Sequence, residues 1–339
     1  MSRRRSADDL EGVVVIDKPA GMTSHDVVQR VRRALGQSRV GHTGTLDPAA
    51  TGVMVVCLGR ATRLVQFLQA GTKTYAARMV LGIETDSQDA DGEIIARMAA
   101  DHIDERQLCE ALTKFQGQIA QIPPMVSAVK VGGERLHRKA RRGEVVDREP
   151  RHVTVHDLVL DMFEPGEHPR ASFLVTCSSG TYVRTLAHDV GHDLGVGGSL
   201  ESLRRLANEP FHLDEAVSLE DFEEAAQAGR MSEFIMSAYD AAIRALPVWD
   251  VEDAGLVMQL VSGARLDMER RMPPAAVVGA DAFAVTWSNL LVGVYKPMGQ
   301  EGIARQARAA LVWSQPDDVG GIQVDTPTSA TPTDRGAGA

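Results

Sequence analysis

Two kinds of apolar spacing dominate the first part of the chain. Residues 13–16 and 53–58 are short, continuous apolar runs, which are typical of buried strands, and the first predicts a strand at 13–17. Over residues 24–35, apolar side chains recur every three or four positions, and Gly36 follows the last of them. This spacing predicts a helix that begins at a hydroxyl cap and ends at Gly36.

The later segments repeat both patterns. Apolar and polar residues alternate in three further segments and predict strands at 73–81, 153–163 and 171–177. Helical spacing predicts helices at about 61–69, 104–115, 182–194 and 252–261, and an acidic helical region at 218–244. Short apolar runs near the end predict strands at 282–287 and 290–295.

The mixture of strands and helices predicts a mixed α+β fold, and 339 residues are enough for two or three domains. Pro247 is a candidate boundary between a large domain and a small β-rich one. The resulting organisation is a disordered tail at 1–10, a main domain at 11–246 with an insertion at about 121–152, a second domain at 247–314 and a disordered tail at 315–339.

Residues 41–52, Gly-His-Thr-Gly-Thr-Leu-Asp-Pro-Ala-Ala-Thr-Gly, interrupt the regular pattern. Their glycines, threonines and proline predict a shaped loop. Asp47 is the one acid over residues 27–83, a stretch with eight basic side chains. A lone carboxylate in such a loop is a candidate nucleophile or base, and the alternative is an Asx-type turn closed by Asp-Pro.

Charge is unevenly distributed along the chain. The formal net charge is −10, yet residues 27–83 and 128–152 are each predominantly basic. Screening makes the local field the relevant one for a bound polyanion, so these two segments are candidate phosphate-binding surfaces. The alternative for each is an ordinary solvated surface.

Composition excludes several other classes of protein. No apolar run approaches the roughly 20 residues of a membrane span, and the basic N-terminus lacks the apolar stretch of a secretory signal. Cys57, Cys109 and Cys177 are far apart and form neither a disulfide framework nor a CxxC zinc motif. We therefore expect a cytoplasmic protein in a reducing compartment.

Two motifs resemble metal sites. Residues 85–92 resemble a calcium loop, but Ser87 and Met98 would stand where an EF-hand needs acids, which favours a plain acidic turn. His188 and His192 have the spacing of helical zinc ligands, but the sequence shows no clear third ligand, which favours solvated histidines. No metal is expected at either place.

A series of motifs resembles the TruB family of bacterial tRNA pseudouridine-55 synthases over residues 12–213. The motifs are Lys-Pro-Ala-Gly-Met-Thr-Ser at 18–24, the loop at 41–52, Lys-Thr-Tyr at 73–75, Pro-Pro at 123–124 with Ser-Ala-Val-Lys at 127–130, Gly-Thr-Tyr-Val-Arg at 180–184 and Leu-Arg-Arg at 203–205. Their order and spacing are specific to this family in combination.

The resemblance implies a pseudouridine-synthase fold, with an extended, mainly antiparallel sheet, a central cleft and a small PUA-like C-terminal domain. It implies that a uridine in the T-loop of tRNA, at position 55, is isomerised to pseudouridine. The base is detached from C1′, rotated and reattached through C5, which requires no redox step, metal or organic cofactor. The uridine must leave its stack to reach a protein carboxylate.

The resemblance also implies roles for individual residues. Asp47 would be the ionised carboxylate, although its point of attack (C1′, C6, or elimination at C2′) stays open. Arg184 would pair with Asp47 and keep it ionised. Tyr75 would stack on the extruded uracil and could assist a proton transfer. Tyr182 and Leu203 would form walls of the pocket.

Other implied contacts concern the tRNA. His42 would help to occupy the space that the flipped nucleotide vacates, and Lys18 would support the Asp47 loop. Lys130, Arg141 and Arg142 belong to a basic arm that corresponds to the family's RNA-clamping insertion. The chain departs from many relatives at Met125, Val126 and His137, which could alter RNA contacts. A monomer is expected, without membrane or metal partners.

Two further hypotheses compete with the enzyme. A module that binds and folds tRNA without chemistry would use the same basic surfaces. An aspartyl-phosphate phosphotransferase would require a Mg²⁺ site around Asp47, but the loop lacks the second acid of the common Asp-x-Asp pattern. Substitution of Asp47 separates the first two hypotheses.

Overall fold

The structure is a computed structural model that describes residues 10–127, 130–136, 142, 144, 146–299 and 305–319. The chain divides into two compact units, Met1–Ala245 and Leu246–Ala339, which are treated separately below. Within the described residues, every helix is too short or too polar to cross a lipid bilayer.

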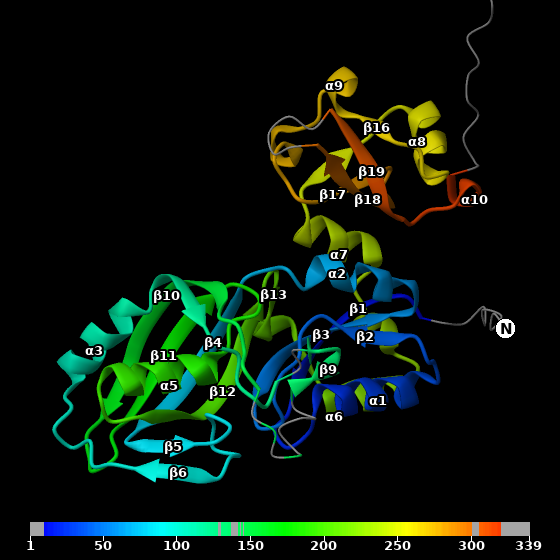
Figure 1. The fold of residues 1–339 in the computed structure, drawn as a ribbon. Coiled ribbons are helices and arrows are strands. Elements are labelled where there is room, and N and C mark those ends of the chain that lie inside the picture. The colour runs from blue at the N-terminus through cyan, green and yellow to red at the C-terminus, as the bar shows by residue number, and fades with distance from the viewer. Residues whose placement is uncertain are drawn as a thin grey trace, which may run out of the picture. The chain divides into compact units, whose positions relative to one another are not determined.

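A ten-stranded sheet forms the frame of the first unit (Figure 1). Its main path has the order β14-β1-β3-β12-β4-β11-β10-β7, with β2 beside β3 and β13 beside β12. Only the β1–β14 and β3–β12 pairs of this sheet are parallel. The strands are β1 (Gly12–Lys18), β2 (Val40–His42), β3 (Thr51–Leu58), β4 (Lys73–Leu81), β7 (Gly117–Gln121), β10 (Arg151–Glu164), β11 (Arg170–Cys177), β12 (Gly198–Asn208), β13 (Phe211–His212) and β14 (Val217–Ser218).

Helices and two small hairpins complete the first unit. The α-helices are α1 (Ser24–Leu35), α2 (Val65–Leu68), α3 (Glu105–Lys114), α5 (Val183–Asp193), α6 (Leu219–Gln227) and α7 (Ala238–Ala245). The 3₁₀ helices are η1 (Gly59–Leu64), η2 (Leu213–Glu215) and η3 (Met231–Glu233). The hairpins are β5 (Ile83–Thr85) with β6 (Ile94–Arg97) and β8 (Lys130–Val131) with β9 (Glu134–Arg135).

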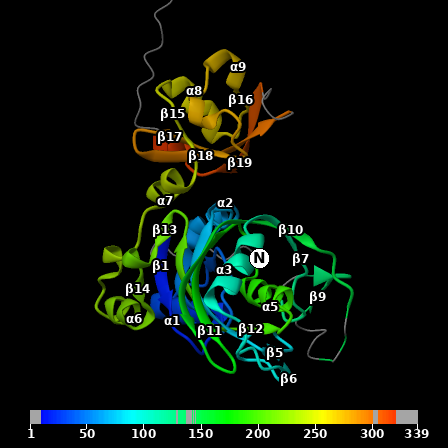
Figure 2. The ribbon, with the colours of Figure 1, turned by 90° about the vertical axis from the view of Figure 1, so that its left-hand side faces the viewer.

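Among the described residues, separate apolar cores cover different parts of this sheet. One joins α1 and α6 to β1 and β3 and includes Val27, Ile16 and Phe222. The other joins α3 and α5 to β4, β10 and β11 and includes Leu108 and Phe173. Figure 2 shows the first pair of helices against one end of the sheet and the second pair farther along it. The sheet therefore carries two packed lobes, and β12 runs between β3 of one and β4 of the other.

The N-terminal helix begins and ends as its sequence predicts. Thr23 accepts a hydrogen bond from the Asp26 backbone N–H, and the Asp26 carboxylate accepts one from the Thr23 N–H, which forms a capping box. Gly36 ends the helix in the left-handed conformation, with a φ of 62°. The apolar stripe of α1 is buried at Val27, Val28 and Val31.

The two lobes join where β3 runs beside β12. Gly52 pairs with Arg205 across this parallel contact and has a φ of 100°. A Cβ atom at Gly52 would overlap the backbone carbonyl oxygen of Arg205. Glycine at this position therefore allows the loop at 43–50 to return to the sheet directly beside β12.

The second unit contains a five-stranded sheet in the order β15-β17-β18-β19-β16. Its core gathers apolar side chains of α8 and of the central strands, among them Leu260, Phe283 and Tyr295. The elements are β15 (Val248–Asp250), α8 (Ala254–Val261), β16 (Leu266–Asp267), α9 (Met268–Arg271), η4 (Ala275–Val277), β17 (Phe283–Trp287), β18 (Leu290–Met298), β19 (Gln306–Val312) and α10 (Pro316–Val319).

The mixed α+β class and the mainly antiparallel sheet are confirmed. The helical region predicted at 218–244 is also confirmed and is divided between α6 and α7. Two local predictions were wrong. The helix predicted at 61–69 is a 3₁₀ helix followed by four α-helical residues. The predicted disordered tail at 315–339 begins with α10, whose Val319 packs into the apolar core of the second unit. Residues 1–9 and 320–339 of the predicted tails lie outside the described residues.

We predict that Gly52→Ala lowers the free energy of unfolding by about 3 kcal/mol or more, because the new methyl group would meet backbone rather than a movable side chain. Gly36→Ala is the matched control. Gly36 also has a positive φ, but open space surrounds its missing Cβ, so a loss of about 1 kcal/mol is expected. Urea denaturation of both variants measures the difference, and equal losses would contradict the proposed overlap.

Candidate active site

Side chains of β1 and α1 hold the loop between β2 and β3 by hydrogen bonds to its backbone. The Lys18 ammonium on β1 donates to the carbonyl oxygens of Pro19, Pro48 and Ala50 at 2.9, 3.0 and 2.6 Å. Ser24 accepts from the Leu46 N–H at 2.8 Å and donates to the Leu46 carbonyl at 3.0 Å. Asp47 therefore sits between two residues whose backbone carbonyls are fixed by buried donors.

Lys18 is fully buried. Burial lowers the pKa of its ammonium to about 8, and the nearby Asp47 carboxylate opposes that shift. At neutral pH most of the molecules keep this ammonium charged. Lys18 thus gives the loop both hydrogen bonds and a positive charge, as its expected supporting role requires.

Arg184, in the first turn of α5, connects the loop to two other segments. Its guanidinium lies 3.2 Å from the Asp47 carboxylate and 3.2 Å from the Asp89 carboxylate. It also donates to the carbonyl of Val126 at 2.8 Å. The side chain is 5% exposed, so these partners surround a buried permanent charge.

Two opposing influences act on Asp47. Burial raises the pKa of its carboxyl group above the ordinary value of 3.8, while the Arg184 guanidinium lowers it. Asp89 raises the same pKa through like-charge repulsion. The Asp47 side chain keeps 41% of its surface exposed, so the carboxylate is enclosed by protein and still accessible to a ligand.

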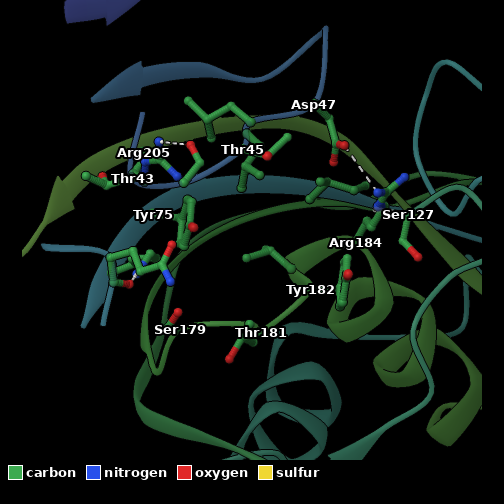
Figure 3. Close-up of a pocket in the computed structure, with 18 residues that line it drawn as sticks. Thr43, Thr45, Asp47, Tyr75, Ser127, Ser179, Thr181, Tyr182, Arg184 and Arg205 are labelled. Atoms are coloured by element: carbon green, nitrogen blue, oxygen red, sulfur yellow. Dashed lines mark hydrogen bonds and ion pairs between the residues drawn. The ribbon is translucent and has the colours of Figure 1, made fainter. Parts of the chain in front are cut away.

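A cavity of about 390 Å³ opens beside this carboxylate (Figure 3). Five residues that the sequence selected line it together, although they come from the loop, β4, α5 with its N-cap, and β12. They are Asp47, Tyr75, Tyr182, Arg184 and Leu203. The cavity lies where β12 connects the two lobes, which corresponds to the expected central cleft.

Tyr75 and Arg205 form the floor of the cavity on neighbouring strands. Tyr75 on β4 pairs directly with Arg205 on β12 and is 6% exposed. The Arg205 guanidinium donates to the carbonyls of Val53 at 2.6 Å and Gly44 at 3.2 Å. Burial raises the pKa of the Tyr75 hydroxyl, and Arg205 opposes the rise. Tyr75 therefore stays a neutral hydroxyl with its ring in the cavity wall.

The other predicted contact residues lie elsewhere. His42 ends β2 and does not line the cavity; burial lowers the pKa of its imidazole. Lys130 is in β8, and its side chain is outside the described part, as is all of Arg141. Arg142 is exposed and forms ion pairs with Glu134 and Glu144. In this conformation Arg142 is occupied by acids of its own arm.

Sequence reasoning missed three residues of the site. Asp89 belongs to the acidic turn that was interpreted as plain, and its contact with Arg184 depends on tertiary packing. Arg205 and Lys73 stand in motifs that the resemblance included, but neither was given a role. Alternation along a strand could have placed Arg205 on the same face as Leu203 and opposite Arg204.

Part of the basic segment near Asp47 has a structural role. Arg30, Arg60 and Arg78 form ion pairs with Glu223, Glu11 and Glu201, respectively. Lys73 is buried and donates to the carbonyls of Gln69 and Gly71. These four basic side chains are therefore engaged by partners within the protein.

Comparison with known proteins assigns the chain to a family. The model of the TruB family pseudouridylate synthase N-terminal domain matches residues 32–183, and that of the tRNA pseudouridylate synthase B C-terminal domain matches residues 184–245. A Thermobifida fusca protein named tRNA pseudouridine synthase B is 43% identical over 85% of this chain and 97% of its own length. The chain belongs to the TruB family of pseudouridine synthases.

Other TruB relatives and a solved structure agree. A Geobacter sulfurreducens protein with the same name is 42% identical over 83% of this chain and 96% of its own. A crystal structure of a Cbf5-Nop10-Gar1 complex contains a chain that superposes with a TM-score of 0.71 at 28% identity, covering 91% of this chain and 86% of that one. The C-terminal of the two TruB models ends at residue 245, where the first unit ends.

Proposed function

We propose that this chain isomerises the uridine at position 55, in the T-loop of tRNA, to pseudouridine, with Asp47 as the essential carboxylate. The observation that carries the proposal is the accessible Asp47 carboxylate paired with a buried arginine in a cavity that also contains Tyr75. Membership of the TruB family supplies the reaction and the substrate class.

The size and position of the cavity suit an extruded nucleotide. About 390 Å³ accommodates one nucleoside but not a stacked duplex. A base in a folded T-loop hides its glycosidic bond within the stack, so the reaction requires the nucleotide to flip into the site. Tyr75 offers the flat ring against which uracil would stack, and Tyr182 and Leu203 form apolar walls.

The charges of the site suit a carboxylate that must be ionised to react. Arg184 counteracts the effect of burial on the pKa of Asp47 and orients the oxygen that it contacts. Asp89 fixes the other side of the guanidinium. Asp47 would enter the reaction at C1′, at C6 of the ring or through elimination at C2′.

The remaining contacts of the proposal concern the body of the tRNA. The basic arm, with Lys130, Arg141 and Arg142, would bind phosphates, and His42 would fill the space left by the flipped nucleotide. The second unit would act as a PUA-like RNA-binding domain. A cytoplasmic monomer is the form in which we expect the protein to act.

The first test is Asp47→Asn, which keeps the size of the side chain and removes its charge. Pseudouridine formation should fall by about 10³-fold or more, because the essential group is gone. Affinity for unmodified tRNA should stay within about threefold, because phosphate contacts dominate binding. Carbodiimide-stop mapping measures the product, and filter binding measures the affinity.

Asp101→Asn is the matched control, because Asp101 is an exposed aspartate in a turn outside the cavity. It should retain wild-type activity. If the Asp47→Asn protein forms pseudouridine at the wild-type rate, the proposed chemistry is wrong. If wild-type protein binds tRNA but produces no stop in the T-loop, the chain acts as a binding and folding module instead.

The second test uses the pH dependence of kcat/KM for tRNA. Because burial raises the pKa of Asp47, the acid limb of the profile should lie above pH 3.8. Arg184→Gln removes a charge that lowers this pKa and should move the limb upward by about one unit or more. Asp89→Asn removes a charge that raises it and should move the limb downward.

Arg204→Gln provides the control for this test. Arg204 is adjacent to Arg205 but points to the other face of β12, where it pairs with Asp17 at 2.7 Å. Its loss should leave the acid limb unchanged. Shifts in the same direction for the Arg184 and Asp89 variants would refute the proposed balance of charges at Asp47.

A further inference from the structure

Three potential metal ligands lie close together near the C-terminal half of α5, whereas Arg184 is in its first turn. His188 and His192 lie one helical turn apart on α5, and their ring centroids are 4.3 Å from each other. Glu84 on β5 places its carboxylate 3.2 Å from Nε2 of His192. One ligand atom from each residue lies within 4.8 Å of the other two. The sequence alone showed no third ligand, because Glu84 comes from a distant segment.

The surroundings orient these side chains. Nδ1 of His188 lies 3.1 Å from the Asp189 carboxylate, which leaves Nε2 as the nitrogen available to a ligand. Gly197 lies against the Glu84 side chain, since a Cβ atom there would overlap the Glu84 carboxylate. Metal-binding histidines commonly contact a carboxylate through the nitrogen that does not bind the metal, as His188 does here. The position of Glu84 is restricted by Gly197, so two of the three ligands are already oriented.

We propose that Glu84, His188 and His192 bind one divalent transition-metal ion of the zinc class. Two imidazole nitrogens and one carboxylate oxygen suit Zn²⁺, which is bound tetrahedrally at about 2.0–2.2 Å. The ligand atoms must approach one another by about 1 Å to reach this geometry. His192 is 53% exposed, so a water molecule can take the fourth position from solvent.

The bound ion fastens the segment of residues 84–89 to α5. Arg184, His188 and His192 follow one another at intervals of four residues and therefore share one face of the helix. Arg184 pairs with Asp89 at one end of this face, and Thr185 donates to Gln88 at 2.8 Å beside it. The metal adds a third attachment at the other end, so its expected effect is to restrain the acidic turn that supplies Asp89.

The competing explanation is an ordinary ion pair between protonated His192 and Glu84, with His188 as a neighbour. Such a pair requires no metal and would be insensitive to zinc. His212 and Glu209 form a comparable exposed pair, 3.3 Å apart, in the same unit. That pair serves as an internal reference, because it supplies two ligands where the proposed site supplies three.

Zinc binding by the full chain, without a histidine tag and with exposed Cys109 replaced by serine, tests the proposal. Isothermal titration should give one site per chain. His192→Gln and Glu84→Gln should each weaken binding at least about tenfold, whereas His212→Gln should not change it. Thermal unfolding without metal checks that each variant is folded. His192 is more exposed than Glu84, so its substitution is the less disruptive of the two.

Amide hydrogen exchange gives a second measurement, independent of tRNA. Zinc should slow exchange in residues 83–92 of the Cys109→Ser protein and leave exchange unchanged when His192→Gln is added. A Kd for zinc weaker than about 100 μM in the Cys109→Ser protein would overturn the proposal. Equal zinc binding by the His192→Gln protein, or protection confined to other segments, would also overturn it. This inference does not depend on the proposed reaction.

Discussion

The site depends on the contacts that the buried guanidinium of Arg184 makes with its neighbours. It contacts the Asp47 loop, the acidic turn at Asp89 and the carbonyl of Val126, while α5 carries it. An arginine cannot lose its proton to escape burial, so each partner is needed to compensate the charge. Four segments that are far apart in sequence are therefore held in one arrangement by a single side chain.

This arrangement places opposite demands on Asp47. Enclosure by protein makes its carboxylate less stable as an ion, and Arg184 and Lys18 restore part of that stability. Asp89 acts against them, both by repelling Asp47 and by sharing the guanidinium. The carboxylate is thus neither fully neutralised by one arginine nor left without a partner, a balance suited to a group that must be charged and still react.

Local sequence patterns predicted the helices and strands of this fold better than the tertiary contacts between them. Alternation of apolar and polar residues predicted β4 with Tyr75 on its buried face. A hydroxyl cap and Gly36 predicted the two ends of α1. Each of these signals lies within a few neighbouring residues. Asp89 and Glu84 were missed because their contacts are with side chains of α5, which comes much later in the chain. The loop and its acid were recognised as unusual from composition, but the choice of nucleophile over turn needed the family resemblance.

The Asp47 loop is held by cationic donors on neighbouring strands and by one internal turn bond, from the Ala50 N–H to the Asp47 carbonyl at 3.1 Å. Lys18 on β1 holds the carbonyls of Pro48 and Ala50, and Arg205 on β12 holds that of Gly44. The carbonyl groups that these donors hold lie before and after Asp47 in the sequence, so both sides of the loop are anchored. Gly52 makes this possible, because any larger residue would separate β3 from the strand that carries Arg205. The position of the carboxylate therefore depends on the sheet, because β1 and β12 carry the donors that hold the loop on either side of Asp47.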